Sequence, residues 1–268
     1  MKFENIKVFN FEGALRGMRN PKNSWDKSDS FFGLVNIDDD EHDFDVAYAW
    51  ANSAMRGEEN EDKKDEIAED CDKWLMKNGL LDIDYNHQVA NVAFIGPNDM
   101  KLAKQLIAAG SEHRKFLRQI MVTVDITAPL FWWKEADTYK VGTTANSTST
   151  MHKLTDKPIT LECFEIGDYC PNIATKGEVD YFIHFLEGLR LKYLATKDKL
   201  YWKELVRWLP ESWLQTRTIT LSYENVRNMV HQRDHHKLIE WSKTDGKKID
   251  SFIKFAQTLP YANEFIFD

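Results

Sequence analysis

The spacing of apolar residues along the chain predicts strands at two places. Val8 and Phe9 mark an opening strand within residues 1–12. The stretch 118–128 alternates between apolar and polar positions and is rich in β-branched residues, so it predicts a second strand, which Pro129 closes.

Helical periodicity dominates the remainder of the chain. Residues 95–110 have a start signal at Pro97, an apolar stripe and a stop at Gly110. Further helices are predicted at 41–79 in two halves, at 179–210 as a pair that stops at Pro210, at 222–243 and at 248–260. The polar segment 16–30 is rich in turn formers and predicts a loop.

This order of elements favours an α+β fold with a mixed or antiparallel sheet and long helices in the second half, rather than a βαβ repeat. We expect one domain over residues 1–268. Residues 1–90 would form an N-terminal part with an acidic helical segment, and residues 91–268 would form the core.

Composition narrows the class of protein. The chain is 43% hydrophobic and 13% aromatic, which is typical of a globular protein. Its net charge of -8 disfavours a broad nucleic-acid surface but allows a mononucleotide site, because a few cations can hold one phosphate. We find neither a membrane-spanning apolar run nor a signal-peptide core, and the three cysteines lack zinc-ligand spacing. We therefore expect a cytoplasmic protein without membrane or nucleic-acid partners.

Hydroxyl-bearing residues crowd into 134–154, directly after the apolar stretch 125–133. Tyr139, Lys140 and Thr143 stand near the start of the crowded part, which continues with further threonines and serines. Such a segment can supply hydrogen bonds to a polar ligand, or it can be a plain surface loop.

Three other segments carry candidate chemistry. Arg207 and Arg217 flank a helix end, where they could bind a phosphate or cap the helix. His231 and His235 have i, i+4 spacing, which can bind a metal, although polar helix residues without a ligand are the more ordinary interpretation. The cationic residues of 110–119 lie directly before a predicted strand, where they could bind an anion or serve as charges at the edge of a sheet. The chain contains neither of the Gly-rich nucleotide fingerprints GxGxxG and GxxxxGK[ST].

Taken in order, two blocks of the sequence resemble the flavin-dependent thymidylate synthases. In the first, "KLAKQLIAAG" and "VTVDITAPLF" match the family's helix and strand, and the motif RHRxxSxNxxSxRY falls on Thr138-Tyr139-Lys140 and "VGTTANSTSTM". In the second, "VRWLP" and "ENVRNMVHQRDHHKLIEW" resemble the family's ARxxLP and NxRxxxxFxxxR…HAQxE.

The resemblance implies a homotetramer that uses FAD, with NADPH and methylenetetrahydrofolate as co-substrates, to methylate a pyrimidine deoxynucleotide at C5. Reduced flavin would supply the hydride. The residues carried over to the flavin are Tyr139, Lys140, Thr143, Asn225, Arg227 and His236. Those carried over to the nucleotide are Arg207, Arg233 and Thr150, and Thr148, in the place of the family's substrate-side Ser, is carried over as the catalytic residue.

Several positions depart from the family pattern. The RHR positions retain one cation, Lys140, so bidentate phosphate recognition is lost there. A nucleotide-binding Arg is replaced by Thr150, and the family Gln falls on Leu238. The leading hypothesis is thus a divergent thymidylate synthase-like enzyme that modifies a pyrimidine deoxynucleotide. The alternatives are an inactive descendant that senses nucleotides or binds a partner as an oligomer, and a viral or host-defence protein that acts through its oligomeric surface.

Overall fold

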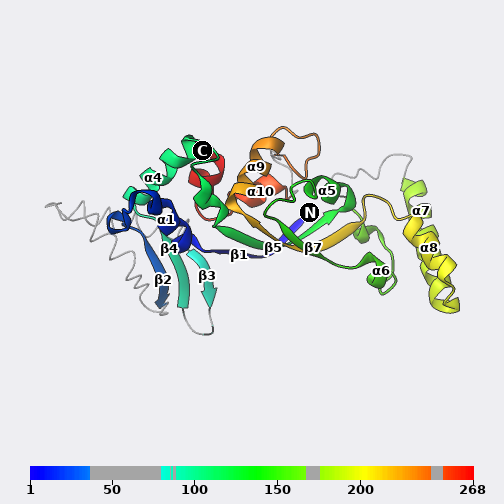
Figure 1. The fold of residues 1–268 in the computed structure, drawn as a ribbon. Helices are drawn as coiled ribbons and strands as arrows, with labels where there is room; N and C mark the ends of the chain where they lie inside the picture. The colour runs from blue at the N-terminus through cyan, green and yellow to red at the C-terminus, as the bar shows by residue number, and fades with distance from the viewer. Residues whose placement is uncertain (37–79, 85, 87–88, 167–175, 243–249) are drawn as a thin grey trace, which may run out of the picture. The chain divides into compact units, whose positions relative to one another are not determined.

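The computed structural model describes residues 1–36, 80–84, 86, 89–166, 176–242 and 250–268 (Figure 1). The helices predicted within 41–79 lie outside the described residues, as do Cys71 and Cys170. The chain divides into two compact units. Unit 1 comprises 1–6, 124–220 and 234–254, and unit 2 comprises 7–123, 221–233 and 255–268.

A four-stranded sheet with the order β1-β5-β7-β6 is the framework of unit 1. Its strands are β1 (Lys2–Phe9), β5 (Met121–Pro129), β6 (Thr144–Ser147) and β7 (Leu214–Ser222), of which β1, β5 and β7 also contribute residues to unit 2. Strand β6 pairs antiparallel with β7 and forms one edge of the sheet.

Strand β5 separates the two faces of this sheet. Val124, Ile126 and Ala128 are completely buried, whereas Asp125 and Thr127 between them are half-buried. Buried and half-buried residues alternate along β5 because successive side chains of a strand point to opposite faces of the sheet, and only one of these faces is covered.

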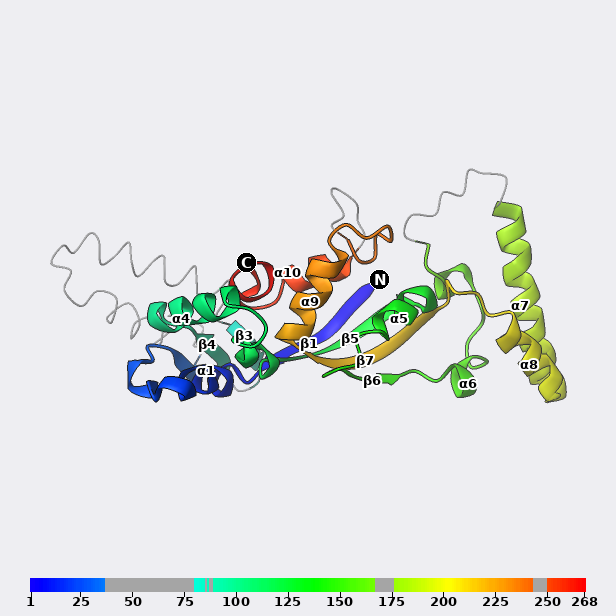
Figure 2. The same cartoon turned by 45° about the horizontal axis from the view of Figure 1, so that its top comes forward.

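Helix α5 (Leu130–Ala136) starts directly after Pro129 and covers the apolar face of the sheet, as Figure 2 shows. The indole N–H of Trp133 donates to the main-chain oxygen of Gln215 on β7 at 2.9 Å. The buried indole N–H thereby has a hydrogen-bond acceptor on the strand against which the ring packs.

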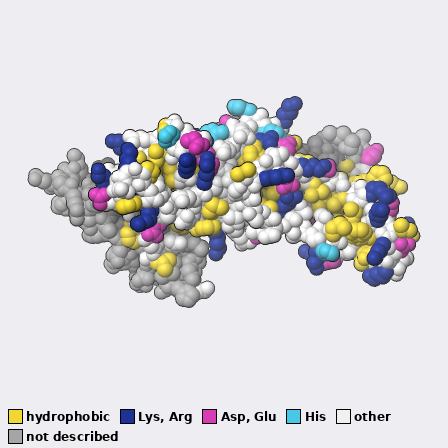
Figure 3. Space-filling view, in the orientation of Figure 1, with side chains coloured by type: hydrophobic (Ala, Val, Ile, Leu, Met, Phe, Trp, Pro, Cys, Tyr) yellow, Lys and Arg dark blue, Asp and Glu magenta, His cyan; other side chains and the backbone are white. Residues whose placement is uncertain are grey.

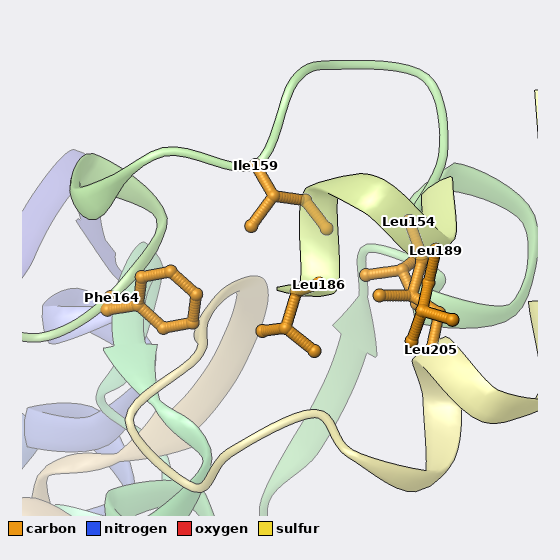
Figure 4. Close-up of a cluster of buried hydrophobic side chains, with 6 residues drawn as sticks. All are labelled: Leu154, Ile159, Phe164, Leu186, Leu189 and Leu205. Carbon is orange, nitrogen blue, oxygen red and sulfur yellow. The ribbon is translucent and has the colours of Figure 1, made fainter. Parts of the chain in front are cut away.

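A helical hairpin completes unit 1. Helix α7 (Lys176–Thr196) and helix α8 (Lys199–Arg207) pack together, and the side chain of Asp198 caps α8 by accepting from Leu200 N–H at 2.9 Å. Their shared core also receives residues from the segment that contains α6 (Thr150–Lys153) and the 3₁₀ turn η5 (Leu161–Cys163). Figure 4 shows this cluster, which consists of Leu154, Ile159, Phe164, Leu186, Leu189 and Leu205.

Unit 2 holds a three-stranded antiparallel sheet with the order β2-β4-β3. Its strands are β2 (Phe31–Asn36), β3 (Leu80–Asp84) and β4 (Val89–Phe94). Its helices are α1 (Phe11–Arg19), α4 (Pro97–Ala108) and α9 (Tyr223–Arg233), with short turns η1 (Asn20–Lys22), η2 (Trp25–Lys27), η4 (Lys115–Arg118) and the π-helical η6 (Asn263–Phe267). Helix α10 (Phe252–Gln257) has residues in both units.

Aromatic rings fill the core of unit 2. Phe11 lies 5.6 Å from Tyr223 and 5.6 Å from Tyr261 between ring centroids. The hydroxyl of Tyr261 donates to Ala93 O at 2.7 Å and accepts from Ile95 N–H at 2.9 Å. Tyr261 thus ties the C-terminal segment to strand β4 with both of its hydrogen-bonding functions satisfied.

A buried ion pair fixes the start of α4. Asp99 is 0% exposed and Arg19 is 5% exposed, and Arg19 Nε donates to Asp99 Oδ1 at 2.5 Å. The hydroxyls of Ser28 and Ser30 both donate to Asp99 Oδ2 at 2.5 Å. Asp29 accepts from the first free N–H groups of the helix, at Asn98 and Asp99.

The α+β fold class is confirmed, as are the opening strand, the helix at 95–110, the strand at 118–128 and the two helices within 179–210. The expectation of a single domain over 1–268 stays a prediction. Within the described residues, we find no helix long and apolar enough to cross a membrane.

Four sequence-based predictions need correction. The helix predicted at 222–243 ends at Arg233, because His236 and Trp241 beyond it turn into an aromatic cluster. The helix predicted at 248–260 is only Phe252–Gln257 among the described residues. The supposed loop 16–30 contains the last turn of α1 and two 3₁₀ turns. Strands β2, β3, β4, β6 and β7 were not expected, although "TRTITLS" in β7 shows period-two alternation.

We predict that Asp99→Ala destabilises the protein by about 3–5 kcal/mol, because it leaves the Arg19 guanidinium buried without its counter-charge. Chemical unfolding monitored by circular dichroism measures the change. The matched control is Asp26→Ala in the same segment, where an exposed carboxylate is removed and about 0.5 kcal/mol or less is expected. Equal small effects of both substitutions would contradict a structural role for the pair.

Candidate functional site

The hydroxyl-rich segment 134–154 becomes the edge strand β6 and its two flanks. The register places Thr144 opposite Thr220 and Asn146 opposite Thr218 on β7. Thr148, just after the strand, donates to the main-chain oxygen of Thr216 with both its amide at 2.9 Å and its hydroxyl at 3.2 Å. The segment therefore extends the sheet rather than forming a free loop.

Two rows of polar side chains cross the sheet on its open face. One row runs from Thr148 through Thr216 to Thr127. Thr148 donates to the main-chain oxygen of Thr216, and the hydroxyls of Thr216 and Thr127 lie 2.7 Å apart. The other row runs from Asn146 through Thr218 to Asp125 and Asn5. We call this surface the hydroxyl face; it consists of Asn5, Asp125, Thr127, Asn146, Thr148, Thr216 and Thr218, all exposed or half-buried.

Asp125 is the charged residue of the hydroxyl face. Thr218 Oγ1 donates to one carboxylate oxygen at 2.5 Å, and Asn5 Nδ2 donates to the other at 2.7 Å. Asn5 has φ 53°, a left-handed conformation that asparagine tolerates well. The hydrogen bond from Thr218, and next that from Asn5, lowers the pKa of Asp125 below its ordinary value. The carboxylate is therefore ionised at neutral pH and accepts hydrogen bonds.

An aromatic cluster lies in the same unit. Trp132 and Trp241 stack with ring centroids 4.5 Å apart, and both are 0% exposed. The rings of Tyr139 and His236 lie 6.3 and 6.4 Å from the ring of Trp241. We call Trp132, Tyr139, His236 and Trp241 the tryptophan cluster; it brings together two of the residues predicted to contact flavin.

The imidazole of His236 is held by contacts at both nitrogens. Leu238 N–H lies 3.2 Å from Nδ1 and donates to it, so the proton of the neutral ring resides on Nε2. Nε2 lies 3.2 Å from Oε2 of Glu135 on helix α5. These contacts fix the orientation of the ring beside Trp241.

Two buried polar atoms of this region have no hydrogen-bond partner among the described residues. They are the hydroxyl of Thr143 and the indole N–H of Trp132. Burying an unpaired polar group costs free energy on the order of 1–3 kcal/mol, so such atoms usually have a partner in the functioning molecule. Thr143 is thus suited to receive a polar atom from a bound ligand or a water.

The cations of unit 1 differ in their availability. Arg217 on β7 stacks on the ring of Trp133 at 4.3 Å and donates to Asp137 at 2.7 Å. Arg207 is exposed at the end of α8 and pairs with Glu204 one turn earlier. Lys140 is exposed, and Thr150 is the first residue of the short helix α6.

The second motif block places three of its residues on helix α9 in unit 2. Asn225 forms the helix cap with Ser222, whose hydroxyl donates to Asn225 Oδ1 at 2.5 Å. Arg227 is 8% exposed and donates to the main-chain oxygens of Ile266 at 3.0 Å and Asp268 at 2.7 Å. Burial, and next the nearby Arg114, lowers the pKa of Arg227. Arg233 is half-buried at the last helical position.

The structure thus brings Tyr139, His236 and Thr143 into unit 1 with Thr148, and it places Asn225, Arg227 and Arg233 in unit 2. The roles carried over to all of these residues stay predictions. Sequence reasoning missed Asp125, Thr127 and Thr218 as site candidates. The available signal was the polar half of the period-two alternation in two strands, which shows that one face of a sheet is open.

The other candidate segments have structural partners. Helix α9 ends before His235, so His231 and His235 do not share a helical face. In the described ranges we find no group of three or more His, Cys, Asp or Glu that could hold a metal ion. Arg114 pairs with the buried Glu224 at 3.1 Å, and Arg118 donates to Ser111 O at 3.4 Å.

No family profile and no curated protein matches the sequence. Solved structures with a similar fold include the following three. A flavin-dependent thymidylate synthase ThyX from Helicobacter pylori, complexed with FAD and dUMP, has 14% identity and a TM-score of 0.46 over 63% of this chain and 83% of that chain. A second structure of ThyX from the same organism, with the same ligands, has 12% identity and a TM-score of 0.47 over 89% of this chain and 98% of that chain. The UMP/dUMP methylase PolB from Streptomyces cacaoi, bound with 5-Br UMP, has 11% identity and a TM-score of 0.42 over 62% of this chain and 84% of that chain.

We predict that Thr218→Val raises the pKa of Asp125, because the larger of its two stabilising hydrogen bonds is removed. A carboxylate with a depressed pKa stabilises the fold above its unfolded pKa, and this stabilisation is lost as pH falls through the folded pKa. In the Thr218→Val variant, the free energy of unfolding should therefore fall less on acidification than it does in the wild-type protein. NMR titration of the carboxyl carbon measures the shift, with Thr216→Val as the control because Thr216 bonds Thr127 instead. An unchanged titration in Thr218→Val would refute this account of the face.

Proposed function

We propose that this chain binds a pyrimidine deoxynucleotide on the hydroxyl face and, with FAD, modifies C5 of its base. The observation that carries the proposal is the continuous polar surface on which Thr148 and Asn146 of the motif segment join Asp125, Thr216 and Thr218. A segment that the motif comparison assigns to nucleotide binding is thereby built into a surface of convergent hydrogen-bonding groups.

The chemistry of the hydroxyl face suits a nucleoside. Hydroxyl and amide side chains both donate and accept, as the mixed edge of a pyrimidine and the hydroxyls of a sugar require. Asp125 accepts, so ligand N–H or O–H groups would lie over it, whereas a phosphate there would meet charge repulsion. The phosphate would instead be met by Arg207 and Thr150 of unit 1. The motif comparison also assigns Arg233 to the nucleotide, and that assignment stays a prediction.

Thr148 would contact the base through its oxygen. Its hydroxyl proton is directed to the main-chain oxygen of Thr216 at 3.2 Å, so lone pairs on Oγ1 are left for a ligand donor. This distinguishes Thr148 from a free serine, which could donate to the substrate equally well.

The residues of unit 1 fit a flavin. The unpartnered hydroxyl of Thr143 and the oriented ring of His236 offer hydrogen bonds, and Tyr139 supplies an aromatic wall. Lys140 is an exposed cation for the phosphates. Asn225 and Arg227 are assigned to the flavin as well, although the guanidinium of Arg227 is engaged with main-chain oxygens of its own chain. Bound flavin would supply hydride chemistry, with NADPH and methylenetetrahydrofolate as co-substrates of a cytoplasmic homotetramer.

A second function is favoured by the hydrogen bonds that three arginines already make within the chain. Arg207, Arg217 and Arg227 all donate to groups of the chain itself. A protein whose anion ligands are committed in this way could retain nucleotide binding and lack turnover. The alternative is therefore an inactive nucleotide sensor or partner-binding oligomer.

We predict that FAD and dUMP each raise the melting temperature of the purified protein, and that protein saturated with FAD is yellow. A ligand at a hundred times its Kd stabilises the folded state by about 2.7 kcal/mol, which a thermal melt detects readily. A purine mononucleotide is the control. Stabilisation by dUMP alone would support the sensor, and a colourless protein that neither ligand stabilises would overturn the proposal.

We predict that Thr143→Val weakens FAD binding and leaves the ligand-free protein as stable as before or more stable. The loss of one neutral hydrogen bond to the ligand, worth about 0.5–1.5 kcal/mol, corresponds to a roughly two- to thirteenfold increase in Kd. The ligand-free protein loses only an unpaired buried hydroxyl. Fluorescence titration with FAD and a melt without it measure the two effects, with Thr144→Val as the exposed neighbouring control. An unaltered FAD affinity would remove Thr143 from the cofactor site.

A further inference from the structure

Two hydroxyls of the hydroxyl face use their protons within the chain. The hydroxyl of Thr218 donates to Asp125 Oδ1 at 2.5 Å, and that of Thr148 donates to the main-chain oxygen of Thr216 at 3.2 Å. A hydroxyl has one proton and two lone pairs, so each of these oxygens can still accept a hydrogen bond but no longer donates one. At both positions the face therefore offers an acceptor to a ligand.

Asp125 adds the strongest acceptor of the face. Its carboxylate receives one hydrogen bond on each oxygen, from Thr218 and from Asn5. The two oxygens of a carboxylate have about four acceptor positions between them, so about two stay open. Asp125 is half-buried beside the exposed Thr218, so a ligand can reach these positions from solvent.

No cation balances this carboxylate within the described residues. Hydrogen bonds from Thr218 and Asn5 lower the pKa of Asp125, and no basic side chain of the described ranges contributes. Basic side chains of unit 1 lie on other elements, and Figure 3 shows lysine and arginine side chains gathered over α7 and α8. A carboxylate that lacks a counter-ion attracts ligand groups that donate hydrogen bonds.

We propose that the hydroxyl face selects a cytosine nucleotide, with Asp125 as the specificity-determining residue that accepts from the 4-amino group of the base. The inference rests on the proposed function, because it takes this face as the nucleotide site. Cytosine carries an amino group at position 4, whereas uracil and thymine carry a carbonyl oxygen there. The amino group donates to a carboxylate. A carbonyl oxygen in the same place would meet a negative charge and the acceptor oxygen of Thr218.

Asn146 can serve the neighbouring ring nitrogen of either base. It is exposed and lies opposite Thr218 in the register of β6 and β7. A side-chain amide presents both a donor and an acceptor, so it suits N3 of cytosine, which accepts, and N3–H of uracil, which donates. Discrimination between the two bases therefore falls on position 4 and on Asp125.

Isothermal titration calorimetry of the full chain with dCMP and dUMP tests the selection. We expect dCMP to bind about 10- to 100-fold more tightly, as one hydrogen bond to a charged group supplies. The deoxynucleotide of 2-pyrimidinone has only a hydrogen atom at position 4 and should lose this advantage. Because dUMP still binds at higher concentration, it remains a valid probe of the proposed function.

The variant Asp125→Asn tests the residue. Asparagine keeps the size of the side chain and adds an N–H that can donate to O4 of uracil. The preference for dCMP over dUMP should therefore fall to about threefold or less, or reverse. Circular dichroism checks that the variant is folded.

The matched control is Asp198→Asn. It removes an exposed carboxylate of the same unit outside the hydroxyl face, where asparagine can still cap α8. Each substitution changes the net charge equally, so the ratio of the dCMP and dUMP affinities is compared rather than either affinity alone. The control should keep the wild-type ratio.

The outcomes separate this inference from the function on which it rests. If neither nucleotide binds, the proposed function fails and the inference fails with it. If dUMP binds as tightly as dCMP, or if Asp125→Asn leaves the ratio unchanged, nucleotide binding stands and the inference is overturned. A preference for CMP over dCMP together with UMP over dUMP would assign Asp125 to the ribose hydroxyls, and would overturn it as well.

Discussion

The alternation of side chains along β5 is the constraint on which the rest of unit 1 depends. Val124, Ile126 and Ala128 are sealed against solvent, so the residues between them must face the opposite side of the sheet. A shift of register by one residue would bury Asp125 and expose the apolar set. The buried face thus fixes the position of the polar face, and the hydroxyl face is a consequence of core packing.

The position of strand β6 depends on the same alternation of side chains, because β6 pairs with β7 in the same sheet. Its four residues are exposed and offer little apolar surface, so pairing with β7 and the bonds of Thr148 to Thr216 hold it on the sheet. An edge strand as short as β6 also limits unwanted pairing with other chains. Because β6 carries part of the motif segment, Asn146 and Thr148 become regularly spaced neighbours of Thr218 and Thr216 on β7.

The sequence allowed prediction of the elements whose local signals agree with their tertiary setting. The strand ending at Pro129 and the helix between Pro97 and Gly110 are of this kind. Helix α9 was predicted too long, because nothing local shows that Trp241 stacks on Trp132 and draws the chain out of the helix. The polar rows were missed for a related reason: they are formed by four strands distant in sequence, and only the sheet order reveals them.

The motif segment carries Thr138 and Thr150 where the family it resembles has arginines, and under the proposed function this difference would change how a ligand is selected. Arginine binds a phosphate through charge and a rigid fork, largely irrespective of what the phosphate carries. Hydroxyl and amide groups are weaker individually and directional, so they discriminate among ligands by the pattern of donors and acceptors. With Asp125 as the charge at its centre, the hydroxyl face favours groups that donate. Under the proposed function, recognition would therefore rest on the base and sugar more than on the phosphate, and the base is where C5 chemistry would take place.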